Sequence, residues 1–373
     1  TDGDIQYPFW YQLPLAPYSR RRTLMKEVVP GQVWTLEQVF GTFYVYVPIR
    51  MTVLKVADGL LVYAPVAATP ECIREVRKLE QMHGPVRWIL LPSKALEHKV
   101  TAPPFAKAFP DALLYVAPGQ FSVPLDLPLA VLGFPEYTVL DAASLDSLPW
   151  KNDCDTALLD IGTFGEVALF HKASKSLLLV DSLTAISKDP PELLLDDEYR
   201  KALFYHARDG DETLEATPEV LQKGWARIAL FATFFSPGAL ADGSVTVPET
   251  FGSRPWAWQP GWQASFERLR NNGRAFSAPI IRELILNQSV QAAQAYVKKL
   301  ASWPLERVVP AHFSCPIPLT QKQLLEAYAF TGVGQAPDYC SEDLSLLGDI
   351  QRSAVPNVVP VRATSRCGYA SRA

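Results

Sequence analysis

The chain has 373 residues, a formal net charge of −4 and an isoelectric point near 5.8. This balance gives no basic surface overall, so we expect no nucleic-acid partner. The apolar runs are much shorter than the roughly 20 residues that a membrane-spanning helix needs, so we expect no membrane span. The sequence also lacks a glycine-rich loop of the kind that holds phosphates, so we expect no nucleotide cofactor.

Residues 1–30 do not have the pattern of a domain. They combine prolines and aromatic residues with the basic run Arg20-Arg21-Arg22. We interpret this segment as an extended N-terminal arm. Its aromatic side chains must pack on something, either the chain's own surface or a partner protein.

From residue 33 onward, apolar runs alternate with amphipathic segments. Runs rich in β-branched and aromatic residues, separated by turns near 40–41 and 58–59, predict antiparallel strands between 33 and 65. The other predicted elements are a helix at 70–82, a strand at 86–91, a helix near 102–109, and strands at 112–116, 156–161, 167–170, 176–180 and 307–310. This alternation implies an α/β protein in which two sheets pack face to face with helices outside, an αββα sandwich. His171, beside a predicted hairpin turn, is expected at the surface.

Two regions depart from this alternation. Residues 187–306 are largely helical in pattern and contain a cluster of Trp and Arg between 251 and 274. The cluster predicts either a small aromatic core with a solvated arginine face, or a lid or docking face for a partner. Residues 331–373 lose apolar periodicity and are rich in Ser, Pro, Ala and Arg, which predicts a flexible or partner-bound C-terminal tail.

The cysteine pattern is sparse. The five cysteines have no Cys-x-x-Cys spacing, and they are Cys72, Cys154, Cys315, Cys340 and Cys367. An odd number without paired spacing argues against a disulfide framework and against a structural zinc knuckle.

Polar residues that can bind a metal follow three of the apolar runs. Glu97 and His98 follow the run at 86–91, Asp181 ends the run at 177–180, and His312 follows the run at 307–310. Strand ends of layered α/β proteins collect their side chains in a shared cleft, so these four residues are expected to converge. Two imidazoles and two carboxylates suit one ion of zinc, iron(II) or manganese. The same residues also fit a decayed site held by hydrogen bonds alone.

These segments also carry a family resemblance. The sequences GLLVYAP (59–65), WILLPSKALEH (88–98), LLLVDSL (177–183) and VVPAHFS (308–314) resemble the metallo-β-lactamase fold. The resemblance extends over roughly residues 30–330 and is closest to an uncharacterised branch of that superfamily found in plants, algae and cyanobacteria. It implies a domain at 31–330 with a helical insertion at about 187–306, and, through the branch, a plastid location.

The resemblance implies only half of the usual metal site. The superfamily's His-x-His-x-Asp-His loop corresponds to residues 93–98, where Ser93 and Ala95 replace its first two histidines. A further histidine expected near Gly162 is also missing. The first metal position is therefore expected to be lost, whereas Glu97, His98, Asp181 and His312 match the second. Cys315 could add a soft ligand, although a small core thiol is the more ordinary role.

Two functions follow from this half site. One is a mononuclear metal-dependent hydrolase with one zinc or iron ion on Glu97, His98, Asp181 and His312. The other is a non-catalytic scaffold or accessory subunit of a plastid, photosynthetic protein assembly. That reading implies a partner bound through the arm, the Trp/Arg-rich insertion or the C-terminal tail. A redox or metal-sensing protein is a third reading, and it would give Cys315 a purpose.

Overall fold

The computed structural model describes residues 3, 20–42, 44–120, 128–162, 164–210, 212–241, 256–332, 338–354 and 365–369. The chain forms two compact units. Unit 1 comprises residues 1–40, 48–181 and 294–324, and unit 2 comprises residues 41–47, 182–293 and 325–373. Most of the predicted N-terminal arm, residues 1–2 and 4–19, lies outside the described residues.

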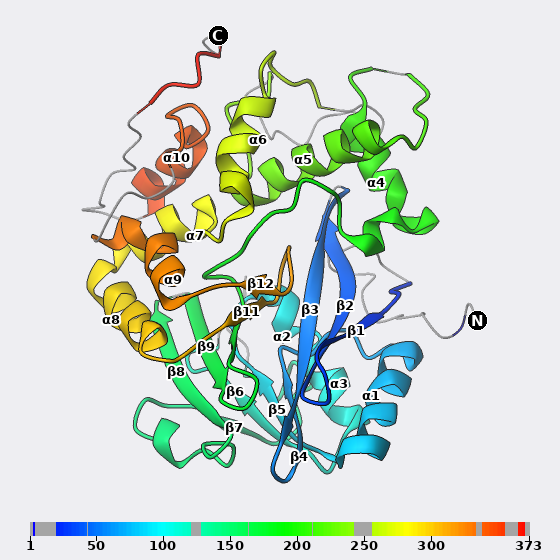
Figure 1. Ribbon diagram of the computed structural model, residues 1–373, viewed down its shortest axis with the longest axis vertical. Helices are drawn as coiled ribbons and strands as arrows, with labels where there is room; N and C mark the ends of the chain where they lie inside the picture. Colours follow the sequence, from blue (N-terminus) through cyan, green and yellow to red (C-terminus); the bar gives the residue numbers. More distant parts are fainter. Residues whose placement is uncertain are drawn as a thin grey trace. The chain divides into compact units, whose positions relative to one another are not determined.

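Unit 1 is built around two sheets (Figure 1). Within the described part of the chain, the first sheet has the strand order β1-β2-β3-β4-β5-β6-β7, and the second has the order β12-β11-β10-β9-β8. The strands of the first sheet are β1 (Leu24–Val29), β2 (Val33–Thr42), β3 (Val45–Val56), β4 (Gly59–Tyr63), β5 (Val86–Leu91), β6 (Leu113–Val116) and β7 (Tyr137–Val139). Those of the second are β8 (Cys154–Ile161), β9 (Phe164–His171), β10 (Ser176–Leu179), β11 (Arg307–Pro310) and β12 (Ile317–Pro318).

The two sheets share one apolar core. Leu61 and Leu90 of the first sheet lie in the same buried cluster as Leu169, Leu178 and Val309 of the second. Because successive strand residues point to opposite faces, the other face of the first sheet needs its own cover. Helices α1 (Pro70–His83) and α3 (Ala102–Ala108) supply it, in a second buried cluster.

The outer face of the second sheet is also covered by chain from unit 1. Phe170 of β9 stacks on Trp303, which follows α8 (Val290–Ala301), with ring centroids 5.5 Å apart. Helix, sheet, sheet and helix therefore follow one another, and the predicted αββα sandwich is confirmed.

Strand direction decides where polar side chains collect. Strands β4, β5, β6 and β7 pair in parallel, and so do β10 and β11. Parallel neighbours end at the same edge of a sheet, so the segments after β5, β10 and β11 can present their side chains to a common place. The short helix α2 (Leu96–Lys99) lies in the segment after β5.

Apart from the end of β2 and the start of β3 within residues 41–47, the regular elements of unit 2 are helical where the structure describes them. Its helices are α4 (Asp197–Ala207), α5 (Pro218–Phe234), α6 (Gln263–Arg270), α7 (Pro279–Leu284) and α10 (Ser345–Ala354), with short 3-10 turns at Glu192–Leu195, Asn271–Gly273, Leu286–Gln288 and Ala329–Thr331. In unit 1, α9 (Gln321–Ala327) begins near the end of the unit, and a 3-10 turn lies at Leu145–Ser147. Thr217 begins α5 by accepting a hydrogen bond from the Val220 amide, and Pro218 follows at the first helical position.

The Trp/Arg-rich segment forms an aromatic core in its described part. The guanidinium of Arg227 lies 5.1 Å from the Trp258 ring centroid and 4.8 Å from that of Trp262. Trp256 stacks on Phe231 with centroids 4.2 Å apart. Residues 242–255, which include Phe251 and Arg254, lie outside the described residues.

One expectation about the cysteines is wrong. Cys340 and Cys367 are joined by a disulfide, whereas the odd count and the absence of paired spacing led us to expect no disulfide framework. The sequence pattern misled because the two residues lie 27 positions apart and meet only through the fold. Cys72, Cys154 and Cys315 are free.

Candidate metal centre

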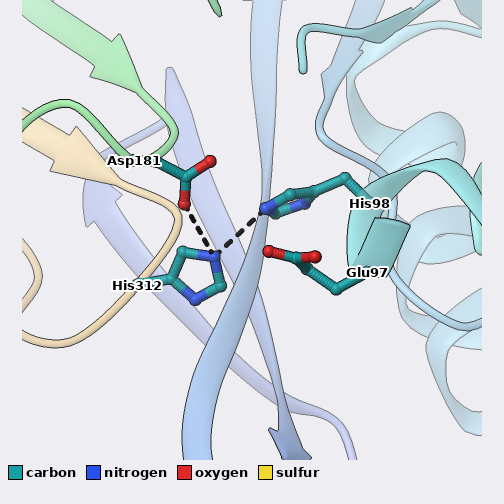
Figure 2. Close-up of side chains that lie close together, drawn as sticks. All are labelled: Glu97, His98, Asp181 and His312. Atoms are coloured by element: carbon teal, nitrogen blue, oxygen red, sulfur yellow. Dashed lines mark hydrogen bonds and ion pairs between the residues drawn. The ribbon is translucent and has the colours of Figure 1, made fainter. Parts of the chain in front are cut away.

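The four expected residues converge in unit 1 (Figure 2). Glu97 and His98 lie on α2, Asp181 follows β10, and His312 follows β11. One ligand atom from each residue lies within 4.8 Å of all the others. The apolar strands before them are buried on both faces, which fixes where each chain segment leaves the core.

The distances between the ligand atoms match those around one small ion. His98 Nε2 lies 3.1 Å from His312 Nε2, and His312 Nε2 lies 3.4 Å from Asp181 Oδ1. Two ligands at about 2.0–2.1 Å from a tetrahedral ion would be separated by roughly 3.3 Å. The donor set of two imidazoles and two carboxylates therefore suits a single ion in chemistry, and the His98–His312 and His312–Asp181 distances have the spacing that such an ion requires.

The orientation of His312 is fixed by its second ring nitrogen. His312 Nδ1 donates a hydrogen bond of 2.9 Å to the carbonyl oxygen of Pro48. A proton on Nδ1 leaves the lone pair of Nε2 directed at the cluster, which is the arrangement that metal-binding histidines use. His98 Nδ1, in contrast, is buried without a hydrogen-bond partner among the described residues.

Arg50 holds the loop that carries His312. Its guanidinium donates to the Pro310 carbonyl oxygen over 2.5 Å and to the Phe313 carbonyl oxygen over 2.7 Å, one on each side of His312. It also forms an ion pair with Glu37. Phe313 has a φ of 55°, a conformation that non-glycine residues rarely adopt and that such flanking contacts can maintain.

Glu166 supports Asp181, and the sequence reading missed it. Its Oε1 accepts hydrogen bonds of 2.8 Å from the amides of Val180 and Asp181, and its Oε2 accepts one of 2.8 Å from the Tyr296 hydroxyl. Glu166 is completely buried on β9. A single acidic residue inside the apolar strand FGEVALF was the available signal, because a buried carboxylate requires partners.

Burial dominates the electrostatics of the cluster. It raises the pKa of Asp181 to about 7, helped by the nearby Glu166 carboxylate and opposed by a hydrogen bond with Ser93. Burial, with the nearby Asp181, also raises the pKa of Glu97. Burial lowers the pKa of His98 well below its ordinary value, and it lowers that of His312. All four shifts favour uncharged side chains, so the protein alone provides little compensating charge.

The polar side chains of the loop before α2 are engaged in hydrogen bonds and an ion pair with the protein. Ser93 Oγ accepts a hydrogen bond from the Ala95 amide, and the buried Lys94 reaches Asp160 Oδ1 at 2.5 Å and the Gly162 carbonyl oxygen at 2.8 Å. A Cβ on Gly165 would lie 2.7 Å from Lys94 Cε, so a larger residue there would require the Lys94 side chain to move. The Lys94 ammonium is therefore held in an ion pair rather than left to solvent.

Two other residues singled out in the sequence do not join the cluster. Cys315 packs against the apolar core between the sheets, as a core thiol does. His171, expected at the surface, is buried on β9, where Nε2 donates to the Lys55 carbonyl oxygen over 3.0 Å and Nδ1 lies 2.7 Å from Ser174 Oγ. Strand β9 includes His171, so the hairpin turn begins only after this residue.

A cavity of about 380 Å³ lies beside this loop. Its lining includes Leu129, Tyr137, Val139 and Gln120, and the Gln120 amide donates 2.9 Å to the Ser93 carbonyl oxygen. The four clustered residues are not part of its lining.

The two packed sheets with helices outside and the convergent strand ends agree with the metallo-β-lactamase-like fold that the sequence resemblance implied. The chain belongs to the family DUF4336, a domain of unknown function, whose profile matches residues 30–330. Among curated proteins, no sequence matches this chain.

Solved structures of similar shape include three with 9–10% sequence identity. The Flv1 flavodiiron core from Synechocystis sp. PCC6803 is 9% identical with a TM-score of 0.41, over 83% of this chain and 61% of that one, so this chain spans less than two thirds of it. The diflavin flavoprotein A 5 fragment from Nostoc sp. PCC 7120 is 9% identical with a TM-score of 0.42, over 83% and 95%. The mono-zinc form of the metallo-β-lactamase FIM-1 from Pseudomonas aeruginosa is 10% identical with a TM-score of 0.33, over 55% and 94%.

Across the described residues, no helix combines the length and the apolar character that a membrane crossing requires.

Proposed function

We propose that Glu97, His98, Asp181 and His312 bind one divalent ion, zinc or iron(II), and that the protein is a mononuclear metal-dependent hydrolase. The observation that supports this most directly is the convergence of four ligand atoms within 4.8 Å of one another from three separate chain segments. Hydrogen bonds from the rest of unit 1 hold two of the four residues, His312 and Asp181, in that arrangement.

The proposal includes the loss of the first metal position. Ser93 and Ala95 stand where the family resemblance places histidines. The Ser93 hydroxyl is engaged with the Ala95 amide, and Lys94 is engaged with Asp160, so neither side chain replaces a lost ligand. One ion, rather than a pair of bridged ions, is the expected content.

The chain's own residues would orient such an ion and shield it. The Pro48 carbonyl keeps the lone pair of His312 Nε2 directed at the cluster, and Glu166 holds the Asp181 backbone in place. When bound, zinc or iron(II) would supply Lewis acidity and a coordinated water of lowered pKa, suited to the hydrolysis of an ester or amide.

The test is metal content, measured by elemental mass spectrometry on purified full-length protein. We expect about one equivalent of zinc or iron in the wild type, lost in Asp181→Asn and in His312→Gln. Two matched controls change the same residue types away from the cluster: Asp155→Asn, whose partner is Lys172, and His83→Gln at the end of α1. Both should retain the ion.

An ion that survives in both Asp181→Asn and His312→Gln would place it elsewhere and refute the site. Absence of any ion from the folded wild type after growth with added zinc and iron would refute the function. Ester or amide hydrolysis that requires the ion, and that is lost when the ion is removed, would support the hydrolase function.

A non-catalytic descendant of this fold is the second candidate, and access to the cluster favours it. The side chains of Asp181 and His312 are 16% and 11% exposed, and His98 is fully buried, so little of the cluster meets solvent. A stoichiometric ion without turnover of ester or amide substrates would select this reading. Partner binding through the arm, the insertion or the C-terminal tail, in a plastid assembly, stays a prediction.

A further inference from the structure

A second cluster, in unit 2, contains two sulfur atoms and a buried carboxylate. Cys340 and Cys367 are disulfide-bonded, with Cα atoms 5.3 Å apart. Asp343 Oδ2 lies 3.1 Å from Cys340 Sγ and 3.5 Å from Cys367 Sγ. Asp343 is only 2% exposed, and its Oδ2 also accepts a hydrogen bond of 2.5 Å from Ser265 on α6.

Asp343 makes the site compatible with both oxidation states of the sulfurs. In the reduced state each thiol is within reach of the same carboxylate oxygen, which can accept a hydrogen bond from a thiol. The two sulfurs also differ in access, because Cys340 is fully buried and Cys367 is partly exposed.

The disulfide joins the segment 365–369 to the chain before α10. The backbone of that segment pairs with it through the bridge between Cys340 and Ser365, and the Ser341 amide donates 3.0 Å to the Ser365 carbonyl oxygen. The Cys367 amide donates 2.9 Å to Glu342. The segment also contacts α6, because the Tyr369 hydroxyl lies 2.6 Å from Ser265 Oγ.

In the described part of the chain these contacts are hydrogen bonds and one backbone bridge, and residues 365–369 are all half-buried or exposed. The covalent bond therefore adds to the restraint on this segment. A segment with few buried apolar contacts opens at low free energy once a covalent restraint is removed.

We propose that Cys340 and Cys367 are a reversible thiol–disulfide site that fixes residues 365–369 on unit 2 when oxidised and frees them when reduced. The reductant is a dithiol, and the oxidant is a disulfide of the same class. One thiolate of the dithiol attacks Cys367 Sγ, the more accessible sulfur, and forms a mixed disulfide while the bond to Cys340 breaks. Cys340 leaves as a thiolate and takes up a proton. The second thiolate of the dithiol then displaces Cys367, so two electrons pass from the dithiol to the pair.

The experiment equilibrates the full-length protein in glutathione buffers of graded oxidised-to-reduced ratio. Peptide mass mapping follows the pair, and amide hydrogen exchange follows residues 365–369. We expect the peptide that links Cys340 to Cys367 at oxidising ratios, and exchange at 365–369 at least about tenfold faster at reducing ratios. Cys367→Ser and Cys340→Ser should each exchange fast at every ratio. Cys315→Ser, which changes a free cysteine of unit 1, should behave like the wild type.

Free thiols at Cys340 and Cys367 throughout the oxidising range would overturn the proposal. So would exchange at 365–369 that is unchanged by reduction. A third contrary outcome is a zinc ion held by the reduced pair together with Glu342. Each of these three residues offers a ligand atom within 4.8 Å of the other two. Such zinc would be lost in Cys367→Ser and retained in His312→Gln, which separates it from the proposed ion of unit 1.

Discussion

Glu166 shows how a residue outside the four candidate ligands can position a candidate metal site. Its carboxylate receives the Asp181 amide on one oxygen and the Tyr296 hydroxyl on the other. The Tyr296 hydroxyl therefore holds the Glu166 carboxylate, which in turn holds the backbone of the candidate ligand Asp181. Residues in this relation to a metal site commonly change metal affinity when they are altered, although they do not touch the ion.

Tyr296→Phe should accordingly weaken metal binding without abolishing it. We expect about a tenfold to hundredfold loss of affinity, with one equivalent still bound at saturation. Titration against a competing chelator measures both quantities. Tyr328→Phe is the matched control, because it removes another buried hydroxyl, one that donates to Ser182 in unit 2. Equal affinities in the two variants would mean that Tyr296 has only a structural role.

His171 provides a pH prediction away from the metal ligands. Burial lowers its pKa, and its hydrogen bonds to Lys55 and Ser174 suit the neutral ring. The unfolded chain protonates this histidine near pH 6.5, whereas the folded chain resists protonation until a lower pH. Stability contributed by His171 is therefore intact above about pH 6.5 and is lost as the pH falls toward the folded pKa.

His171→Gln should remove this part of the acid sensitivity. We expect the free energy of unfolding of the wild type to fall more steeply between about pH 6.5 and 5 than that of the variant, by urea titration at each pH. Val167→Ala, which removes apolar side-chain atoms from the same strand, should lower stability but keep the wild-type slope. Parallel slopes for wild type and His171→Gln would contradict the assignment, whatever their offset.

At the residue scale, the sequence predicted which four residues converge but not what supports them. Asp181 and His312 were identifiable because each stands at or near the end of an apolar run, and Glu97 and His98 because they follow such a run after a short loop. Glu166 was hidden because it stands inside such a run, and its meaning depends on Tyr296, which is 130 positions away. The cover over His171 likewise comes from Lys55 on another strand.

At the element scale, the packing of α4 against α5 depends on one glycine. Gly224 lies within α5, where alanine would ordinarily stabilise a helix by up to about 1 kcal/mol. A Cβ there would lie 2.1 Å from the Leu203 carbonyl oxygen of α4, and backbone atoms cannot move aside as a flexible side chain does. The contact therefore requires the absence of a side chain.

Gly224→Ala should destabilise the protein by about 1–3 kcal/mol, because the two helices must separate to admit the methyl group. The midpoint of urea unfolding and the helical signal measure the loss. Gly210→Ala serves as the control, since its Cβ would meet only the end of the Glu212 side chain, at 3.4 Å. A stabilised Gly224→Ala would show that helix propensity outweighs this contact.

The order of elements could be read from the sequence better than their pairing. The helix predicted at 70–82 is α1, and the strand predicted at 86–91 is β5, because apolar periodicity and the proline at the helix start are local signals. The helical pattern of residues 187–306 did not show where one helix ends and the next begins, as in the succession of α7, a 3-10 turn and α8. Which strands pair in parallel depends on contacts between distant segments, so no local pattern contains it.

At the scale of the whole molecule, the two proposed sites fall in different units. The four candidate ligands all belong to unit 1, whereas Cys340, Cys367 and Asp343 all belong to unit 2. Perturbations at sites that share no partner residue are usually additive within about 0.5 kcal/mol. A ligand that binds only the folded form should stabilise the unit that contains its site.

Zinc and reduction should therefore act independently on amide exchange. Zinc at a free concentration of about 100 times its Kd should protect the peptides that contain residues 96–99 and 312, with a stabilisation of about 2.7 kcal/mol. Reduction should accelerate exchange at 365–369 by the same factor with and without zinc. His312→Gln should abolish only the first effect, and Cys367→Ser only the second. A zinc effect that changes with the redox state would instead reveal coupling between the two sites, and the double variant His312→Gln/Cys367→Ser would measure its size as the departure from additivity.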